Sequence, residues 1–139
     1  MENKVDEHMH ENKHEHKHGE TLPHDHGTIT GEILEEINST TERGAFEEAS
    51  DVFALLGDAT RLKIFWLLCH SEDCVINIAA AVGMSAPAVS HHLKMLKQMK
   101  LIKSRKIGKE VHYKAVDTDE VKLLHEVVES LLKIKCPTE

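Results

Sequence analysis

Long apolar runs are missing from this sequence of 139 residues. The longest run extends only from Ile64 to Cys69, whereas a helix that crosses a bilayer needs ~20 apolar residues. The N-terminal segment is polar and rich in histidine, and it lacks the basic and then apolar stretches of a secretory signal peptide. We therefore expect a cytoplasmic protein that makes no contact with a membrane.

Cysteine is also scarce, because the chain contains only Cys69, Cys74 and Cys136. Three scattered cysteines do not make a disulfide framework. In a reducing cytoplasm they are expected to be free thiols or metal ligands.

Positive charge is in short supply overall, since 17 basic residues face 24 acidic ones and the formal net charge is −7. The distribution is uneven, however. Residues 85–115 contain eight Lys or Arg against the single acid Glu110, which gives this stretch +7 and leaves −14 for the rest of the chain. A basic segment within an acidic chain is typical of a local surface that binds a polyanion.

Histidine, in contrast, is abundant, and residues 8–26 hold seven of the 12 in the chain. This stretch includes HENKH, which fits the H-E-x-x-H pattern of zinc hydrolases. That chemistry requires a helix that presents both histidines and a packed cleft around the metal, and residues 1–27 contain almost no large apolar side chain. We therefore expect a disordered tail here and no enzymatic activity.

The length allows one domain of ordinary size with a tail. A short helix that carries Ile33, Leu34 and Ile37 is expected to end at Asn38-Ser39. In chain order, the predicted divisions are a disordered His-rich tail at 1–27, a short helix or linker at 28–44, a folded domain at 45–135 and a C-terminal tail at 136–139.

Within the domain, apolar residues at helical spacing predict two helices before residue 70, the first closed by Gly57 and the second capped by Asp58. A short helix from Val75 to Val82 ends at a glycine, and Ser85 is expected to cap the next helix, from Ala86 to Lys100. A helix, a short turn with glycine and a second helix form the helix-turn-helix pattern.

Two β-prone runs, Leu101 to Arg105 and Glu110 to Lys114, flank a turn that contains glycine and therefore predict a hairpin. The last predicted helix, from Thr118 to Lys135, carries two apolar faces. Because so small a domain can hardly bury both, one face is expected to pack on a second subunit. The fold class predicted is mainly α with a small β-hairpin.

The second helix of the motif and the hairpin carry the side chains expected to contact DNA. Recognition helices present their N-terminal residues to the major groove, and lysines and arginines of a hairpin suit phosphate contacts. The predicted contact residues are Ser85, Pro87, Ser90, His91, Lys94, Gln98, Lys103, Arg105, Lys106 and Lys109.

These residues lie within a longer resemblance. "VFALLGDATRLKIFWLL", followed by "DCVINIAAAVGMSAPAVSHHLKMLKQMKLIKSRKIGKEVHYKAV" and a closing helix, resembles the ArsR/SmtB family of metal-sensing winged-helix repressors. The likeness covers about Ala45 to Lys135. It implies a winged helix-turn-helix homodimer, joined through its first and last helices, that binds double-stranded operator DNA and leaves it when a divalent metal binds.

The resemblance also implies two places for metal, and the sequence departs from the family at both. Where many members have Cys-Val-Cys-Asp, this chain has Cys74-Val75-Ile76-Asn77, so one thiolate remains. The family completes this site from the N-terminal arm, which makes Cys74, His24 and His26 the preferred ligand set. One thiolate with imidazoles suits tetrahedral Zn(II).

The second family site joins the terminal helices across the dimer, and here Lys133 occupies one of its ligand positions. A protonated lysine has no lone pair to offer. A variant of the site would use Asp117 or Asp119 with His125 and Glu129. Helix capping by Asp117 and a solvated His125 are the alternative reading of these residues.

The function expected is that of a repressor released by Zn(II), with Cd(II) as the next metal and Ni(II) or Co(II) after it. Two alternatives stay open. One is a thiol-redox regulator that uses Cys74 with Cys69 or Cys136, and the other is a metal buffer in which the tail stores zinc.

Overall fold

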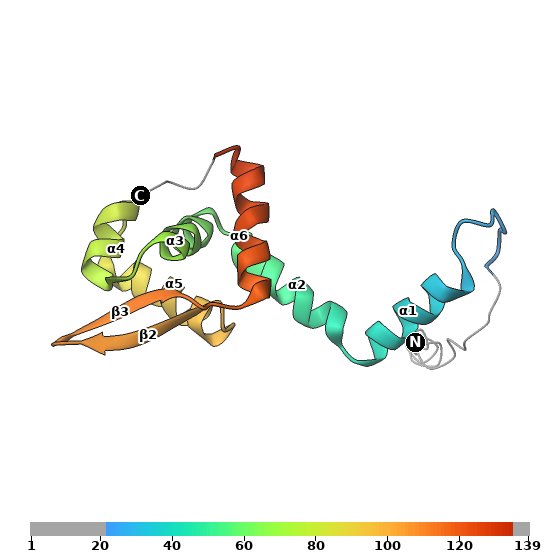
Figure 1. Ribbon diagram of the computed structural model, residues 1–139, viewed down its shortest axis with the longest axis horizontal. Coiled ribbons are helices and arrows are strands. Elements are labelled where there is room, and N and C mark those ends of the chain that lie inside the picture. The colour runs from blue at the N-terminus through green and yellow to red at the C-terminus, as the bar shows by residue number, and fades with distance from the viewer. Residues whose placement is uncertain (1–21, 135–139) are drawn as a thin grey trace, which may run out of the picture. The chain divides into compact units, whose positions relative to one another are not determined.

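A computed structural model of the chain describes residues 22–134 (Figure 1). The chain divides into two compact units, residues 1–50 and 51–139. The predictions made for residues 1–21, including the HENKH stretch, and for Cys136 lie outside the described residues.

Helix α1 (Gly31–Glu42) lies in the first unit and begins where the Thr30 side chain accepts a hydrogen bond from the amide of Ile33. The prediction that this helix ends at Asn38-Ser39 was wrong. The hydroxyl of Ser39 donates to the carbonyl of Glu36 at 3.3 Å, and that of Thr41 donates to the carbonyl of Ile37 at 2.6 Å. Because these hydroxyls bond back into the helix, they do not compete with it and the helix continues to Glu42.

The second unit is built around α3 (Ala59–His70), which follows α2 (Ala45–Leu56) after a two-residue junction. As predicted, Asp58 caps α3, and its carboxylate accepts a hydrogen bond from the amide of Arg61 at 3.0 Å. This amide, together with the Arg61 charge, holds the pKa of Asp58 below its ordinary value.

Helices α4 (Val75–Val82) and α5 (Ala86–Gln98) form the predicted helix-turn-helix. Gly83 ends α4 with φ +70°, a left-handed conformation that favours glycine. The side chain of Ser85 caps α5, as predicted. Helix α5 ends two residues earlier than predicted, because Lys100 takes φ +63° and turns the chain into the next strand.

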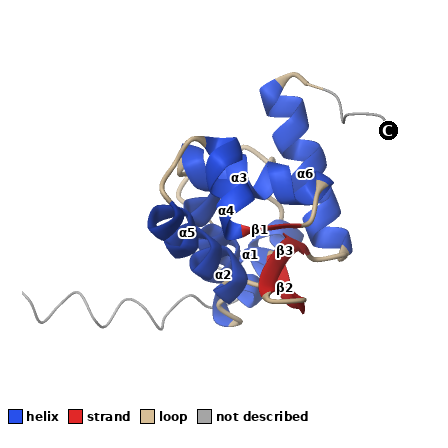
Figure 2. Ribbon diagram, turned by 90° about the vertical axis from the view of Figure 1, so that its left-hand side faces the viewer, coloured by secondary structure: helices blue, strands red, loops and turns tan. Residues whose placement is uncertain are grey.

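The predicted hairpin is confirmed and consists of β2 (Ile102–Ile107) and β3 (Glu110–Ala115). Its strands are longer than predicted and the connecting turn is shorter, so the hairpin extends away from the helices (Figure 1). A further strand, β1 (Asp73–Cys74), pairs antiparallel with β3 and gives the sheet order β1-β3-β2 (Figure 2). Strand β1 was not predicted, because two residues carry no periodic pattern.

The last helix is α6 (Asp119–Leu132), capped by the side chain of Thr118. One face packs into the core through Val121 and Val128. The other leaves Leu123, Val127 and Leu131 exposed, and Leu131 has 77% of its surface accessible. The sequence prediction of two apolar faces on this helix is therefore confirmed.

The core of the second unit contains apolar side chains from all its helices and from β2. Phe65 and Ile64 of α3 lie at its centre and are fully buried. Among the described residues, no helix is both long and apolar enough to cross a membrane.

Candidate nucleic-acid interface and metal-binding residues

Helix α5 is fixed to the core by one face and exposes the other. Val89, Leu93 and Leu96 are almost completely buried, and they recur at spacings that place them on one side of the helix. The residues predicted to contact DNA on this helix and its cap are all exposed; they are Ser85, Pro87, Ser90, His91, Lys94 and Gln98.

Arg61 of α3 holds α5 in place. Its Nε donates to the carbonyl of Leu55 at 2.8 Å, and its Nη1 lies 3.4 Å from Nδ1 of His92 and 3.6 Å from the sulfur of Met95. Arg61 therefore connects the end of α2 to the buried side of α5. The sequence motif contained this arginine, but only the structure assigns it a positioning role.

The hairpin continues the basic surface from α5. Lys103, Arg105, Lys106 and Lys109 are all exposed. The ammonium group of Lys97 in α5 donates to the hydroxyl of Ser104 in β2 at 2.7 Å. This bond ties the helix to the hairpin, so the two basic elements form one surface.

One of the predicted phosphate contacts already has an acidic partner. Arg105 donates through Nε and Nη2 to the two carboxylate oxygens of Glu72, at 2.8 and 2.6 Å. The paired guanidinium holds the pKa of Glu72 below its ordinary value, and the carboxylate raises the pKa of Arg105. Glu72 thus neutralises part of the charge that the hairpin offers to a polyanion.

Cys74, a preferred metal ligand in the sequence analysis, is buried at the junction of β1 and α4. The carboxylate of Asp73 accepts hydrogen bonds from the amide of Cys74 at 2.7 Å and from the side chain of Asn77 at 2.8 Å. These donors lower the pKa of Asp73. His24 and His26 lie in the first unit, where they are exposed and their rings stack with centroids 6.0 Å apart.

The second predicted set, from α6 and the residues before it, divides into two parts. Asp117 is exposed and forms an ion pair with Lys122 at 3.2 Å, while Asp119 lies exposed in the first turn of the helix. His125 and Glu129 lie one turn apart on the face of α6 that packs against α3. The two aspartates therefore do not belong to the same cluster as His125 and Glu129.

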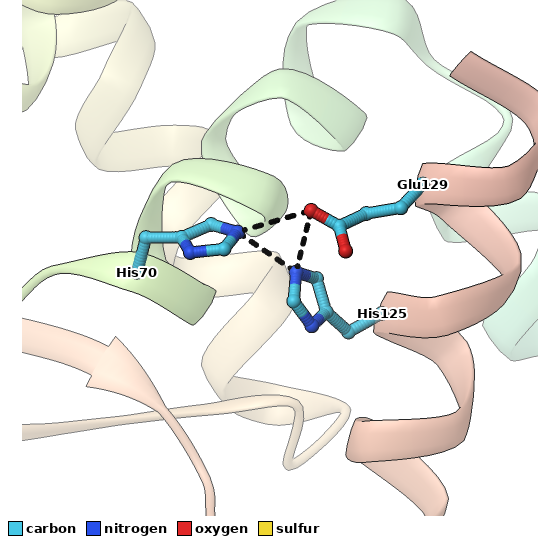
Figure 3. Close-up of side chains that lie close together, drawn as sticks. All are labelled: His70, His125 and Glu129. Atoms are coloured by element: carbon cyan, nitrogen blue, oxygen red, sulfur yellow. Dashed lines mark hydrogen bonds and ion pairs between the residues drawn. The ribbon is translucent and has the colours of Figure 1, made fainter. Parts of the chain in front are cut away.

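The third member of that cluster is His70, the last residue of α3 (Figure 3). Its Nε2 lies 2.8 Å from Nε2 of His125 and 3.4 Å from Oε2 of Glu129, and His125 Nε2 lies 3.3 Å from the same carboxylate oxygen. Within the described part of the chain, these three residues form a group that could hold a metal ion.

His70 was missed in the sequence analysis. It lies 55 residues before His125, and no spacing rule connects two such distant positions. The one available signal was that a histidine directly follows the apolar run from Ile64 to Cys69.

Comparison with known proteins gives a consistent picture. The model of the family described as "Bacterial regulatory protein, arsR family" matches residues 58–104. The transcriptional repressor SmtB homolog of Synechocystis is 35% identical over 85 residues, which cover 61% of this chain and 64% of that protein.

Two further relatives differ in how much of their length is matched. The HTH-type transcriptional regulator MJ1325 of Methanocaldococcus jannaschii is 38% identical over 62% of this chain and 97% of its own length. The cadmium resistance transcriptional regulatory protein CadC homolog of Staphylococcus aureus is 40% identical over 57% of this chain and 65% of its own length.

Among solved structures, the homodimeric winged helix-turn-helix DNA-binding domain Mb0332 of Mycobacterium bovis has a TM-score of 0.59 and 27% sequence identity. The match covers 66% of this chain and 84% of that one. The predicted fold class, a winged helix-turn-helix with a small β-hairpin, is thereby confirmed.

Proposed function

The chain belongs to the arsR family of bacterial transcriptional regulators, and from that premise we propose that it is a metal-responsive repressor. It binds double-stranded operator DNA as a homodimer in the cytoplasm. It leaves the operator when Zn(II) or a similar divalent ion binds.

The observation that carries this proposal is the continuous surface formed by α5 and the hairpin. Its helical part exposes hydroxyl and imidazole groups at the N-terminal end, which would enter a major groove, and ammonium and amide groups further along the helix. Its hairpin part adds lysines, which bind phosphates irrespective of sequence. Recognition of bases and electrostatic attachment are thus provided by neighbouring elements.

The exposed face of α6 supports the homodimer. Leu123, Val127 and Leu131 form an apolar strip that the core of this subunit leaves open, and such a strip is suited to a second copy of the same helix. A dimer presents two recognition helices, which fits a pseudo-palindromic operator.

The metal is proposed from the names of relatives and from the available donors. CadC homologues are named for cadmium resistance. Cys74 with His24 and His26 offers one soft sulfur and two imidazoles, a set that suits Zn(II) first and tolerates Cd(II). Ni(II) and Co(II) rank below these two metals. Of the second set, His125 and Glu129 remain candidates for a metal, whereas Asp117 and Asp119 are not grouped with them in the structure.

The proposal is tested by adding zinc to the protein bound to an operator. A duplex selected from random DNA by the metal-free protein provides that operator, and fluorescence anisotropy at fixed salt measures its affinity. A coupling free energy of about 1–3 kcal/mol predicts that zinc weakens operator binding roughly 5- to 150-fold. Unchanged affinity, with zinc bound to the protein, would contradict the repressor mechanism.

Two variants identify the responsible set. Cys74→Ser and deletion of residues 1–27 should each abolish the response to zinc if Cys74 and the arm share a metal. If the deletion removes most bound zinc while release continues, the tail is only a metal store. If the protein releases the operator when its cysteines are oxidised but does not release it when zinc is added, the thiol-redox alternative is favoured.

A further inference from the structure

We propose that His70, His125 and Glu129 form a divalent-metal site within one subunit, with Zn(II) as its preferred ion and one coordination position open to water. The site bridges the end of α3 and the middle of α6 (Figure 3). Binding of metal here requires no partner subunit. The further claim that this metal controls DNA binding rests on the proposed function.

The donors are of the types that zinc uses. Two imidazole nitrogens and one carboxylate oxygen make up a three-ligand set in which the fourth position is left to water. The same donors also determine which other metals the site would bind. Without a sulfur ligand, the site has little preference for soft ions such as Cd(II).

The spacing of the donors matches a tetrahedral ion. Zn–N and Zn–O bonds of ~2.0–2.2 Å place adjacent ligands of a tetrahedron roughly 3.3–3.6 Å apart. The two nitrogen-to-oxygen distances in the cluster are 3.4 and 3.3 Å. The two Nε2 atoms lie closer, at 2.8 Å, and small ring movements would separate them when both bind one metal ion.

Trp66 orients the carboxylate. Its indole nitrogen donates to Oε2 of Glu129 at 3.1 Å, and its ring packs against that of His70 with centroids 4.5 Å apart. A carboxylate oxygen has lone pairs for both the indole and a metal. Hydrogen bonds of this kind fix ligand geometry and contribute substantially to metal affinity.

Burial makes a cation favourable at this position. The side chains of His70, His125 and Glu129 expose only 19%, 17% and 11% of their surfaces. A carboxylate so far removed from water is costly unless positive charge compensates it. A divalent ion would supply that charge directly.

An opening to solvent lies beside the imidazoles. A surface cavity of about 400 Å³ is bordered by His70 and His125 and also by Ser71 and Lys122. It provides a route by which an ion enters and space for the water that completes its coordination.

Co(II) is the probe for the full-length chain, because tetrahedral Co(II) absorbs strongly in the visible and a sulfur ligand adds a charge-transfer band in the near ultraviolet. We expect a tetrahedral spectrum that persists in Cys74→Ser. The double variant His70→Gln/His125→Gln should lower Co(II) affinity at this site by at least about 100-fold, since even loss of a supporting hydrogen bond costs 10- to 100-fold.

Matched controls separate this site from the histidine-rich arm. In the Cys74→Ser background, where the proposed set of Cys74, His24 and His26 has already lost its sulfur, His24→Gln/His26→Gln removes the same number of imidazoles, and it should leave the tetrahedral band intact. Glu129→Gln keeps a hydrogen-bond acceptor for Trp66 but should lower the affinity of the site for Co(II). Glu126→Gln, on the exposed side of α6, should leave that affinity unchanged. A tetrahedral band that persists unchanged when His70→Gln/His125→Gln is made in the Cys74→Ser background would overturn the proposal.

A measurement on the unmodified chain keeps the proposal testable if the double variant does not fold. Long-range proton-nitrogen NMR spectra should show the Nε2 signals of His70 and His125 shifting together when one equivalent of Zn(II) is bound. If neither signal shifts at saturation, the cluster is a metal-free polar contact between α3 and α6 and the site does not exist.

Measuring operator affinity with and without zinc tests the metal site and the proposed repressor mechanism separately. Zinc that binds the cluster but leaves operator affinity unchanged supports the site and contradicts the repressor mechanism. Zinc that releases the operator from His70→Gln/His125→Gln as well as from the unmodified chain supports the repressor mechanism and overturns control by this site.

Discussion

Glu72 is an acidic side chain that contacts the surface proposed to bind DNA. It pairs through both oxygens with Arg105, so the substitution Glu72→Gln should remove an acid that repels phosphate and release the guanidinium. We expect roughly several-fold tighter operator binding, with the slope of log affinity against log salt steeper by about 1. Anisotropy titrations over a range of salt concentrations measure the slope.

Glu126→Gln is the matched control for this change, because it removes the same charge from the exposed side of α6. Its slope should equal that of the unmodified chain. Equal slopes for Glu72→Gln and the unmodified chain would show that Arg105 does not reach phosphate.

The same ion pair predicts a pH dependence. The ordinary pKa of Glu72 is 4.5 and the Arg105 hydrogen bonds lower it in the folded protein. Between these two pKa values the unfolded chain binds more protons, so stability rises with pH. The contribution is fully present above pH 4.5 and is lost as pH falls through the lowered pKa of the folded state.

Carboxyl carbon NMR follows this titration residue by residue. Arg105→Gln should move the pKa of Glu72 up towards its ordinary value, because the largest cause of the shift is removed. If the pKa of Glu72 in this variant stays as low as before, the pairing with Arg105 is not its cause.

At the level of secondary structure, α6 depends on the cap that begins it. The hydroxyl of Thr118 accepts a hydrogen bond from the amide of Val121 at 3.3 Å. Thr118→Ala should lower the free energy of unfolding by about 1 kcal/mol, since that amide loses its acceptor. Urea denaturation measures the change, and Thr118→Ser should restore most of it.

The helices were predictable from local signals and several of their ends were not. The caps formed by Asp58 and Ser85 do not depend on distant parts of the chain, because the hydrogen bonds that they accept span only three residues. The end of α1 was predicted wrongly because Ser39 can bond either within a helix or beyond it. Strand β1 escaped prediction because its pairing partner lies in β3, far along the chain.

At the scale of the whole molecule, the exposed strip on α6 should control assembly. Val127→Lys/Leu131→Lys places two charges where a second subunit would pack, and we expect a shift from dimer to monomer at micromolar concentration. Operator affinity should fall by at least about 10-fold, because each half-site is then bound separately. Sedimentation equilibrium gives the assembly state.

Lys122→Gln is a control for the double variant, since it changes an exposed residue on the same helix without adding charge to the strip. It should remain dimeric. A dimer that persists in Val127→Lys/Leu131→Lys would show that subunits associate through another surface.

The sequence by itself determined the helix-turn-helix, the basic hairpin and the exposed residues that we propose contact DNA. These features depend on periodicity, capping and local charge, which operate over a few residues. It also put His125 and Glu129 on one side of a helix, because they are four positions apart. Only the tertiary structure brought His70 to them and turned Glu72 towards Arg105. Packing of α3 against α6 and pairing of the strands set those distances, and no local rule contains them.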